Sequence, residues 1–384
     1  MSITRRVWEA LPRKLRRELL FGGMSALAPR ISKPEPAGAG SLTVAGYFAA
    51  TTGLGEGARR MLETMHAQGL SPTAADLTFA HRQGPSGQPF TIPGGPGTII
   101  LHVNGPMLPW ALWEIGRNAV RDKRVIAYWA WELPRLPPDW ERGLRACHRI
   151  WAPSHFCANA FSRPDGPPVT VVPHPVPAPM PSALRRCDFG FPQDAFIGLA
   201  IFDAASSLSR KNPMGAIAAH RLAFGADPSK LLVLKTHNVD RAGNAWSKVA
   251  AAAAEAGNVR ILAEDLPKAD LTALMLMSDV FISLHRAEGF GLSIAEAMAL
   301  GKPVIATGWS GNMDFLRGPG VFAIPCHPTP AFDPQSTYDF PEMLWAEPDI
   351  TAAATELRHL ATDTGLLNPV PIEFPAPDYA KLLG

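Results

Sequence analysis

Residues 279–301 read DVFISLHRAEGFGLSIAEAMALG, and this stretch decides the fold of the chain. Val280 to Leu284 form an apolar run typical of a buried strand, and residues 292–300 follow a helical pattern that Gly301 ends. Between them lies a glycine-containing turn, which exposes the backbone N–H groups of a helix start to an incoming anion. The stretch therefore predicts a strand, an anion-binding turn and a helix in succession.

The same alternation of strand-like runs and helical patterns continues along the chain. We expect strands at 42–48, 72–77, 98–104, 124–130, 149–153, 169–173, 196–202, 230–236, 258–263, 279–284, 303–308 and 320–324. We expect helices to begin near Glu56, Pro109, Pro138 and His155, and to cover 213–225, 243–256, 268–277, 292–300 and 349–361. Strands that alternate with helices in this way predict parallel sheets of the α/β class.

A proline-rich segment divides the chain. Residues 174–181, HPVPAPMP, contain four prolines, which hinder both strand pairing and helix continuation. A chain of 384 residues is also too long for one ordinary core. We therefore predict a basic N-terminal extension at 1–40 and two doubly wound Rossmann-like domains, at 41–180 and 181–384. Ligands would bind in a central cleft that the carboxyl ends of both sets of strands face.

The composition favours a globular protein of a reducing, cytoplasmic compartment. Hydrophobic residues make up 47% and charged residues 18% of the chain, which argues against wholesale disorder. The four cysteines lie far apart, with no spacing typical of disulfides or of a metal knuckle. The net charge of +2 gives no reason to expect nucleic-acid binding. No stretch approaches the roughly 20 apolar residues that span a bilayer.

The N-terminal segment is basic and amphipathic. The first 35 residues carry eight basic residues against three acidic ones, and Trp8, Leu11, Leu15 and Leu19 recur among them at near-helical spacing. Residues 5–33 could therefore lie on an anionic membrane surface. A solvated helix docked on its own domain explains the pattern equally well.

Two carboxylates make the decisive stretch a candidate site. Glu296 falls in a helix that is apolar almost all round, where a charge needs a basic or hydroxyl-rich partner. An ordinary ion pair with a neighbouring Arg or Lys would satisfy this need. Glu288 follows the strand directly and precedes the turn, a position that favours a ligand.

A basic pair follows the strand expected at 196–202. Arg210 and Lys211 precede Asn212 and Pro213, which form a good helix start with a cap and a pre-set first residue. Two cations before a helix N-terminus oppose its dipole, which favours an anion held between them. Two solvated loop cations are the alternative.

A glycine loop follows the first strand. Gly53 and Gly55, in the run GLGEG at 53–57, permit close backbone approach to a ligand. Asp76, about 20 residues on, is also compatible with a dinucleotide fold. The spacing G-x-G-x-x-G is absent, however, which argues against an oxidoreductase.

Aromatic residues concentrate in the first half of the chain. Six of the ten tryptophans fall between residues 110 and 151, and we expect most of them in the core. Trp131 and Glu132, at a strand end, are the candidates for contact with a sugar ring. His174, where the linker begins, is the histidine expected nearest the cleft. We find no nucleophile–base pair and predict no metal site.

Together these residues resemble glycosyltransferase family 4, among the glycosyl transferases group 1, whose members have the GT-B fold. Residues 288–296, EGFGLSIAE, resemble the family motif of two glutamates separated by seven residues, and 301–307, GKPVIAT, are similarly typical. Residues 128–156 are similar to a bacterial branch of the family. The resemblance covers roughly residues 42–362.

The resemblance implies retaining, metal-independent transfer of a sugar from a nucleotide diphosphate donor to a glycan or lipid-linked acceptor, in the biosynthesis of a cell-surface polysaccharide. Glu288 would contact the donor sugar and Glu296 the ribose. Arg210 and Lys211 would neutralise the leaving diphosphate. Gly53 and Gly55 resemble the family's first-domain loop. The backbone amides that would assist belong to Gly289, Phe290, Gly291 and Leu292.

Two other functions stay open. A catalytically silent sugar-nucleotide-binding protein would need the donor site alone, although the presence of Arg210, Lys211, Glu288 and Glu296 favours an enzyme. A GT-B sugar-nucleotide epimerase would need no acceptor.

Overall fold

The protein is described by a computed structural model that covers residues 11–177, 180–338 and 340–384. The expectations for Arg5, Arg6 and Trp8 in the N-terminal segment, and for residues 178–179 of the linker, lie outside the described residues.

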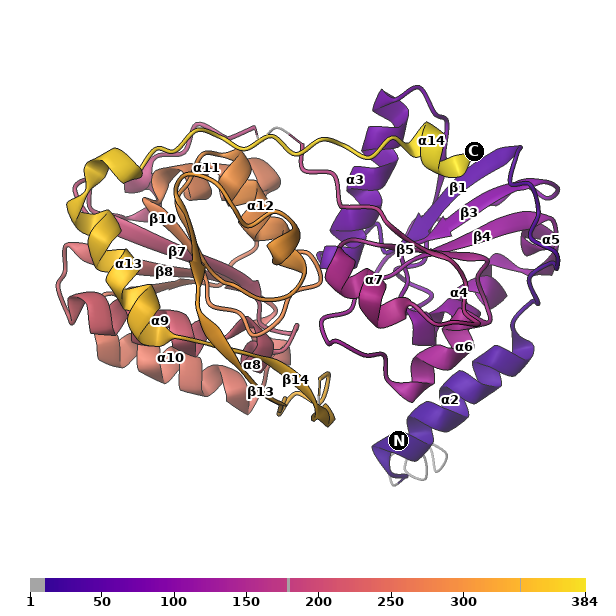
Figure 1. Ribbon diagram of the computed structural model, residues 1–384, viewed down its shortest axis with the longest axis horizontal. Coiled ribbons are helices and arrows are strands. Elements are labelled where there is room, and N and C mark those ends of the chain that lie inside the picture. The colour runs from indigo at the N-terminus through magenta and orange to yellow at the C-terminus, as the bar shows by residue number, and fades with distance from the viewer. Residues whose placement is uncertain (1–10, 178–179, 339) are drawn as a thin grey trace. The chain divides into compact units, whose positions relative to one another are not determined.

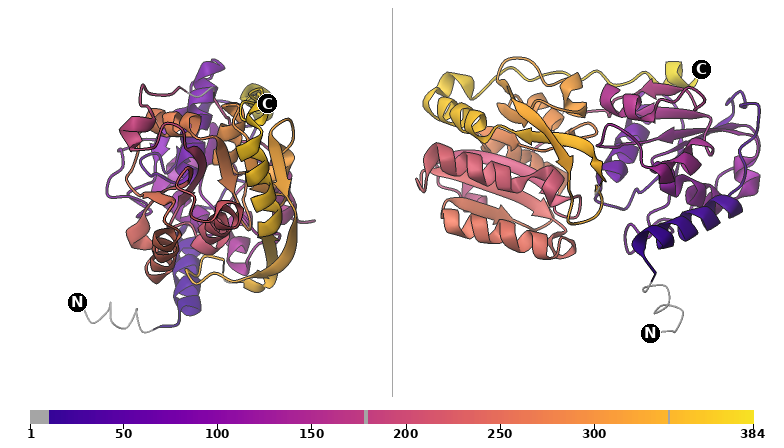
Figure 2. Two further views of the ribbon diagram at one scale, coloured as in Figure 1. Left: turned by 90° about the vertical axis from the view of Figure 1, so that its left-hand side faces the viewer. Right: turned by 60° about the horizontal axis from the view of Figure 1, so that its bottom comes forward.

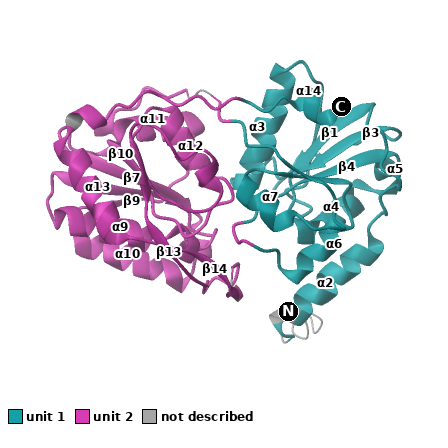
Figure 3. Ribbon diagram, viewed as in Figure 1, with its two compact units in different colours: residues 1–131, 135–175, 376–384 teal, residues 132–134, 176–375 magenta. Residues whose placement is uncertain are grey.

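The chain forms two compact units, which Figure 3 shows in different colours. Unit 1 comprises residues 1–131, 135–175 and 376–384, and unit 2 comprises residues 132–134 and 176–375. The predicted domains 1–40, 41–180 and 181–384 therefore need correction. The described part of the extension, residues 11–40, belongs to unit 1, and the main boundary follows residue 175. Residues 132–134 belong to unit 2 and residues 376–384 to unit 1, in each case the unit other than the one predicted.

Unit 1 is built on a parallel sheet in the order β2-β1-β3-β4-β5-β6 (Figure 1). Its strands are β1 (Ser41–Gly46), β2 (Thr73–Asp76), β3 (Gly97–Leu101), β4 (Lys123–Tyr128), β5 (Arg149–Ala152) and β6 (Val169–Val171). Its α-helices are α2 (Arg13–Leu27), α3 (Gly53–Ala67), α4 (Leu108–Ile115), α5 (Arg117–Val120), α6 (Glu141–Leu144), α7 (His155–Phe161) and α14 (Tyr379–Leu383). Each strand predicted in this half of the chain is present, with ends shifted by a few residues.

Helix α2 packs along α4 on the outside of unit 1 (Figures 1 and 2). Arg17 pairs with Asp139, and Glu18 pairs with Arg142. The segment is therefore docked on its own domain, as one of the two sequence interpretations expected. Among the described residues no helix combines the length and apolar character needed to cross a bilayer.

The C-terminal segment completes the core of unit 1. Tyr379 of α14 is fully buried against Met61 and Met65 of α3, and its ring stacks on that of Trp151 with centroids 6.1 Å apart. Its backbone N–H donates to Gln68 Oε1 at 3.1 Å. Sequence reasoning missed α14 because five residues after a proline-rich run are too short for a periodic pattern.

Unit 2 contains a parallel sheet in the order β12-β11-β10-β7-β8-β9 and a separate two-stranded antiparallel sheet. Its strands are β7 (Phe196–Asp203), β8 (Lys230–His237), β9 (Val259–Leu262), β10 (Val280–Ser283), β11 (Val304–Thr307), β12 (Val321–Ile324), β13 (Cys326–Ala331) and β14 (Phe340–Pro348). Its α-helices are α8 (Leu208–Lys211), α9 (Pro213–Phe224), α10 (Asn244–Ala256), α11 (Lys268–Met277), α12 (Leu292–Ala299) and α13 (Ile350–Thr362).

The main sheet of unit 2 has a core on each face. On β7, Phe196, Ala200 and Phe202 belong to the cluster formed with α9, α10 and α13. Ile197 and Leu199 belong to the cluster formed with α11 and α12. Successive side chains of a strand point to opposite faces, so a strand covered on both faces is apolar throughout. This burial explains why continuous apolar runs identified the strands correctly.

The β13–β14 hairpin was not predicted. Pro328 and Pro330 lie within β13, and proline normally argues against a strand because it lacks a ladder donor. In a two-stranded sheet both strands are edges, where proline is tolerated.

We predict that Tyr379→Ala lowers the free energy of unfolding of unit 1 by about 3 kcal/mol, because it empties a core position. Tyr379→Phe should change it little, since the buried hydroxyl has no hydrogen-bond partner among the described residues. Urea unfolding followed by tryptophan fluorescence measures both. Equal losses in the two variants would contradict the packing role of the ring.

Candidate functional site

The candidate site lies where the strand order of unit 2 reverses. Strands β7 and β10 are parallel neighbours at the centre of the sheet, with Leu199 opposite Phe281. The chain continues from β7 to β8 on one side and from β10 to β11 on the other. Such a reversal leaves a crevice at the strand carboxyl ends, where ligands of doubly wound sheets bind. The predicted basic pair follows β7, and Glu288 follows β10.

Glu288 is held by both predicted cations. Lys211 Nζ lies 2.5 Å from Glu288 Oε1, and Arg210 Nη1 lies 3.3 Å from the same oxygen. The backbone N–H of Glu288 donates to Ser310 Oγ at 2.8 Å. The structure thus brings together three residues that sequence reasoning selected from two separate motifs.

The ionisation of Glu288 follows from this arrangement. Burial raises the pKa of its carboxyl, but the charges of Lys211 and Arg210 outweigh burial and lower the pKa to about 2. Glu288 is therefore a carboxylate at any physiological pH, able to accept hydrogen bonds from hydroxyl groups.

A strained backbone turn places the two cations. Ser207 and Asn212 flank the short helix α8 with φ values of 64° and 52°. Serine seldom adopts a positive φ, whereas asparagine tolerates it better than most residues. Asn212 Oδ1 accepts the N–H of Gly215 at 3.1 Å and so caps α9, as predicted. Its Nδ2 donates to Leu284 O at 2.8 Å. This bond ties the start of α9 to the end of β10.

Arg210 and Lys211 differ in their surroundings. The side chain of Arg210 is 2% exposed and that of Lys211 is 21% exposed. Arg210 Nη1 donates to Ala287 O at 2.8 Å, and Nη2 donates to Ser206 Oγ at 2.8 Å. Lys211 is therefore the more accessible cation for an anionic ligand.

The turn before α12 has the predicted form. Gly291 caps the helix with φ 95°, a conformation that favours glycine, and α12 begins at Leu292. Gly289 and Phe290 complete the turn. The N-terminus of α12 carries the partial positive charge of the helix dipole.

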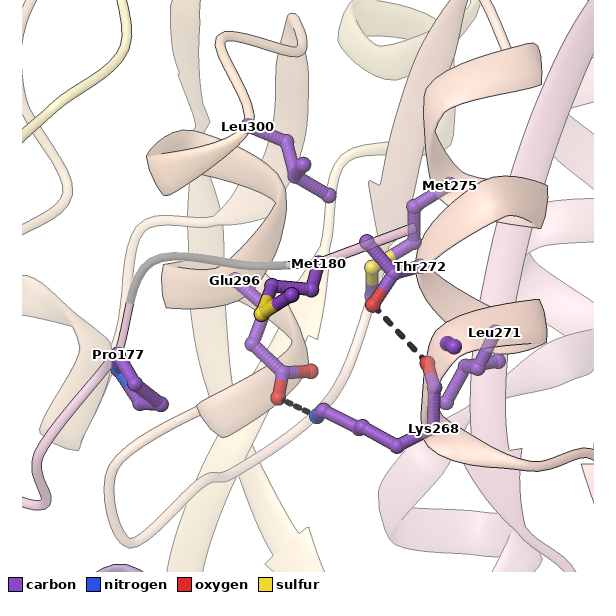
Figure 4. A pocket seen from close by; sticks show the side chains of 9 residues that line it. Pro177, Met180, Lys268, Leu271, Thr272, Met275, Glu296 and Leu300 are labelled. Atoms are coloured by element: carbon purple, nitrogen blue, oxygen red, sulfur yellow. Dashed lines mark hydrogen bonds and ion pairs between the residues drawn. The ribbon is translucent and has the colours of Figure 1, made fainter. Parts of the chain in front are cut away.

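Glu296 pairs with Lys268 at the edge of a pocket (Figure 4). The pocket has a volume of about 290 Å³, and its lining is largely apolar. The lining comes from the linker, α11 and α12 and comprises Pro177, Met180, Lys268, Ala269, Leu271, Thr272, Met275, Glu296 and Leu300. The Glu296 carboxylate is mostly buried, whereas Lys268 is half exposed. The ion pair allowed for in the sequence analysis is thus present.

The glycine loop forms the first turn of α3 in unit 1, which begins at Gly53 rather than near Glu56. A Cβ on Gly55 would lie 2.4 Å from Tyr47 O, so packing of the turn alone requires glycine there. A Cβ on Gly53 would meet no atom within 4 Å, which leaves room for a ligand.

Two other candidates of the sequence analysis are buried in unit 1. Trp131 packs on Trp140 with ring centroids 5.2 Å apart, so it belongs with the core tryptophans rather than with an exposed sugar platform. His174 approaches the Tyr128 hydroxyl with its Nδ1 at 3.3 Å. Burial, assisted by Arg60, lowers the pKa of His174 to about 3, so this histidine is neutral.

Glu132 belongs to unit 2 and has a partner that sequence reasoning missed. The hydroxyl of Tyr338 donates to Glu132 Oε2 at 2.7 Å. The ring of Tyr338 lies 5.2 Å from the guanidinium carbon of Arg210. No motif marks Tyr338, which follows the unpredicted strand β13. Among the described residues no group of three or more His, Cys, Asp or Glu side chains could hold a metal ion.

Residues 211–321 match the family model described as "Glycosyl transferases group 1". The matched segment includes Lys211, Glu288 and Glu296, and the resemblance to this family is confirmed for it. No protein with a curated description matches the chain in sequence.

Solved structures share the fold. HepE of Anabaena, solved with UDP and glucose, has a TM-score of 0.55 and 13% identity, over 85% of this chain and 91% of that chain. The UDP-forming α,α-trehalose-phosphate synthase of Burkholderia xenovorans has a TM-score of 0.57 and 13% identity, over 84% and 91%. The chain covers 49% of TarM of S. aureus, which has 13% identity and a TM-score of 0.49 over 71% of this chain. The predicted GT-B fold, with two Rossmann-like domains, is confirmed.

We predict that Glu288→Gln destabilises unit 2 by about 3 kcal/mol at pH 7, because the buried Arg210 and the partly exposed Lys211 lose their counter-charge. The pKa is depressed in the folded state, so the contribution of Glu288 is fully present above its ordinary value of 4.5 and is lost as pH falls through about 2. The difference between wild type and variant should therefore shrink over this range. Urea unfolding at several pH values measures it.

Glu255→Gln is the matched control, because Glu255 forms an exposed ion pair with Arg221. A difference for Glu288→Gln that does not depend on pH would contradict the assigned ionisation.

Proposed function

We propose that the protein is a retaining glycosyltransferase that moves a sugar from a nucleotide diphosphate-sugar to a glycan or lipid-linked acceptor, in the biosynthesis of a cell-surface polysaccharide. The observation that carries the proposal is the Glu288 carboxylate, held by Lys211 and Arg210 at the reversal of the strand order. The match of residues 211–321 to glycosyl transferases group 1 supports it.

In this reaction the bond between the anomeric carbon and the β-phosphate oxygen breaks, and an acceptor hydroxyl oxygen bonds to the same carbon. The hydroxyl proton leaves with the nucleoside diphosphate. Negative charge grows on the phosphate as its bond breaks, so preplaced positive charge lowers the barrier. Lys211 and the N-terminal amides of α12 supply that charge in our proposal. No bound metal is then needed, because the protein provides the cation.

The two glutamates would bind opposite ends of the donor. Glu288 would accept hydrogen bonds from sugar hydroxyls, and Glu296 from the ribose hydroxyls. The largely apolar pocket beside Glu296 suits the flat face of a nucleobase. HepE was solved with UDP, so UDP-sugars are the first donors to test. In unit 1, the open space beside Gly53 is our candidate for contact with a ligand at the start of α3.

Donor binding tests the proposal directly. UDP-glucose, UDP-N-acetylglucosamine and GDP-mannose should be compared for stabilisation of the full chain, since a ligand that binds only the folded state raises the melting temperature. Stabilisation without turnover on any glycan or lipid-linked acceptor would indicate a silent binding protein. Interconversion of donor sugars without an acceptor would indicate an epimerase.

We predict that Lys211→Ala lowers the transfer rate roughly 10- to 150-fold, the loss expected for one charge-assisted contact to the diphosphate. Lys248→Ala is the control, because Lys248 is exposed on α10. Initial rates with a saturating acceptor measure the effect. Unchanged turnover in a folded Lys211→Ala variant would remove Lys211 from the reaction.

We also propose that the enzyme is cytoplasmic and lies peripherally on an anionic membrane through residues 5–33. Within the described part of this segment, Leu15, Leu19 and Leu27 are exposed while α2 packs along α4. An exposed apolar stripe within a basic segment fits the surface of an acidic bilayer.

Wild-type protein should bind vesicles of phosphatidylglycerol and phosphatidylcholine at low salt and dissociate at high salt, because charge attraction is screened. Leu15→Glu with Leu19→Glu should abolish binding. Leu222→Glu, at an exposed leucine of α9, is the matched control. Vesicle co-sedimentation measures the binding of all three proteins. If the double variant binds as well as the wild type, the proposed membrane-binding surface is wrong.

A further inference from the structure

The tip of the β13–β14 hairpin, residues 332–338, is folded onto the basic loop of the site. Gln335 Oε1 accepts the N–H of Leu208 at 2.5 Å, and Gln335 Nε2 donates to Ala204 O at 3.0 Å. Both partners lie between β7 and the basic pair. Figure 1 shows the hairpin close to α8. The hairpin tip is therefore bound to the loop that carries Arg210 and Lys211.

The hairpin tip has a defined internal structure. The carboxylate of Asp333, which is buried, accepts the backbone N–H groups of Gln335, Thr337 and Tyr338 at 3.0–3.1 Å. A carboxylate that accepts three such bonds closes a loop without help from regular secondary structure. Tyr338 consequently leaves the tip in a fixed direction.

Tyr338 closes one side of the Arg210 guanidinium. Its ring lies 5.2 Å from the guanidinium carbon, within the range of a cation–π contact. Its hydroxyl donates to Glu132 Oε2 at 2.7 Å, and Glu132 Oε1 lies 3.9 Å from Arg210 Nη2. The Glu132 carboxylate therefore holds the hydroxyl end of Tyr338 and also attracts the guanidinium of Arg210.

The remaining contacts of Arg210 are with the protein. Nη1 and Nη2 donate to Ala287 O and to Ser206, and Nη1 lies 3.3 Å from Glu288. A guanidinium that is 2% exposed and bound in this way is committed to Glu288 and its neighbouring backbone. Lys211 contacts the same carboxylate but stays accessible to phosphate.

We propose that Tyr338 is a positioning residue, which fixes Arg210 against Glu288 and thereby orients this carboxylate for the sugar of the donor. Arg210, which the family resemblance places at the diphosphate together with Lys211, then serves recognition of the sugar through Glu288, while Lys211 serves the diphosphate. The inference rests on the proposed function, because it assigns the sugar to Glu288.

The inference predicts different effects on binding of the sugar and of the diphosphate of the donor. Loss of Tyr338 should weaken binding of a nucleotide-sugar and leave binding of the nucleoside diphosphate unchanged. A merely structural role would weaken both alike.

Calorimetric titration of the full chain tests this separation. UDP and UDP-glucose are the probes, with UDP-N-acetylglucosamine and the pair GDP and GDP-mannose titrated alongside. Tyr338→Leu removes the ring and the hydroxyl and should weaken nucleotide-sugar binding roughly tenfold. Tyr338→Phe keeps the ring and should weaken it roughly threefold. Affinity for UDP should stay within about twofold of wild type in both variants.

Phe332→Leu is the matched control, since Phe332 begins the hairpin tip but is 67% exposed, and it should bind both probes as wild type does. Hydrogen exchange of residues 332–340 gives a readout without ligand. Exchange in this segment should rise in Tyr338→Leu and stay near wild type in Phe332→Leu. If Tyr338→Leu fails to fold, the inference is tested with Tyr338→Phe and Glu132→Gln. The affinities of these variants for UDP and for UDP-glucose are then compared in the same way.

The outcomes distinguish the inference from the proposed function. A wild-type protein that binds none of the nucleotides overturns the proposed function and the inference with it. A wild type that binds UDP-glucose, together with variants that bind it equally well, overturns the inference alone. Equal weakening of UDP and UDP-glucose in the Tyr338 variants also overturns it.

Discussion

A carboxylate between two cations organises the site of unit 2. Glu288 is largely removed from water, and a charge in that position is stable only with close counter-charges. Lys211 and Arg210 supply them from a loop that follows another strand. The contact therefore requires β7 and β10 to be neighbours and their following loops to meet, which the strand order provides.

The local backbone is shaped to keep this contact. Ser207, Asn212 and Ser310 adopt left-handed φ values around the cluster, and each costs conformational energy relative to an ordinary turn. Hydrogen bonds from Asn212 to Leu284 O and from the Glu288 N–H to Ser310 oppose that cost. Backbone strain of this kind persists only where the surrounding structure determines it.

The two parallel sheets and much of the candidate site could be predicted from the sequence, and there is one physical reason for this. Strands buried on both faces are apolar throughout, and their carboxyl ends meet at one edge, so Arg210, Lys211 and Glu288 could be brought together from their places after strands. Contacts between side chains of irregular segments could not be predicted in this way, because no strand or helix pattern places those segments. Tyr338 and Glu132 are 206 residues apart and meet through a hairpin whose prolines argued against a strand.

The dependence on side-chain packing and irregular structure also explains why some predictions were only partly correct. The pattern required a partner for Glu296 but could not name Lys268, because the pairing depends on how α11 and α12 pack on one face of the sheet. Trp131 follows the end of β4, yet the ring turns into an aromatic cluster with Trp140, a choice that side-chain packing decides. The domain division missed 132–134 and 376–384 because composition does not mark short segments that pack away from their neighbours.

Burial gives the two adjacent cations different properties. Arg210 keeps its charge in a dry environment because a guanidinium loses its proton with difficulty, and its planar donors can satisfy a carboxylate and a carbonyl at once. An ammonium is more strongly hydrated and rotates freely, which suits the more exposed position of Lys211. Exchanging the two residues would place the strongly hydrated charge in the dry position and the planar one at the surface. The order Arg-Lys is therefore a physical requirement of this loop, and a reversed pair would preserve the net charge while losing the geometry around Glu288.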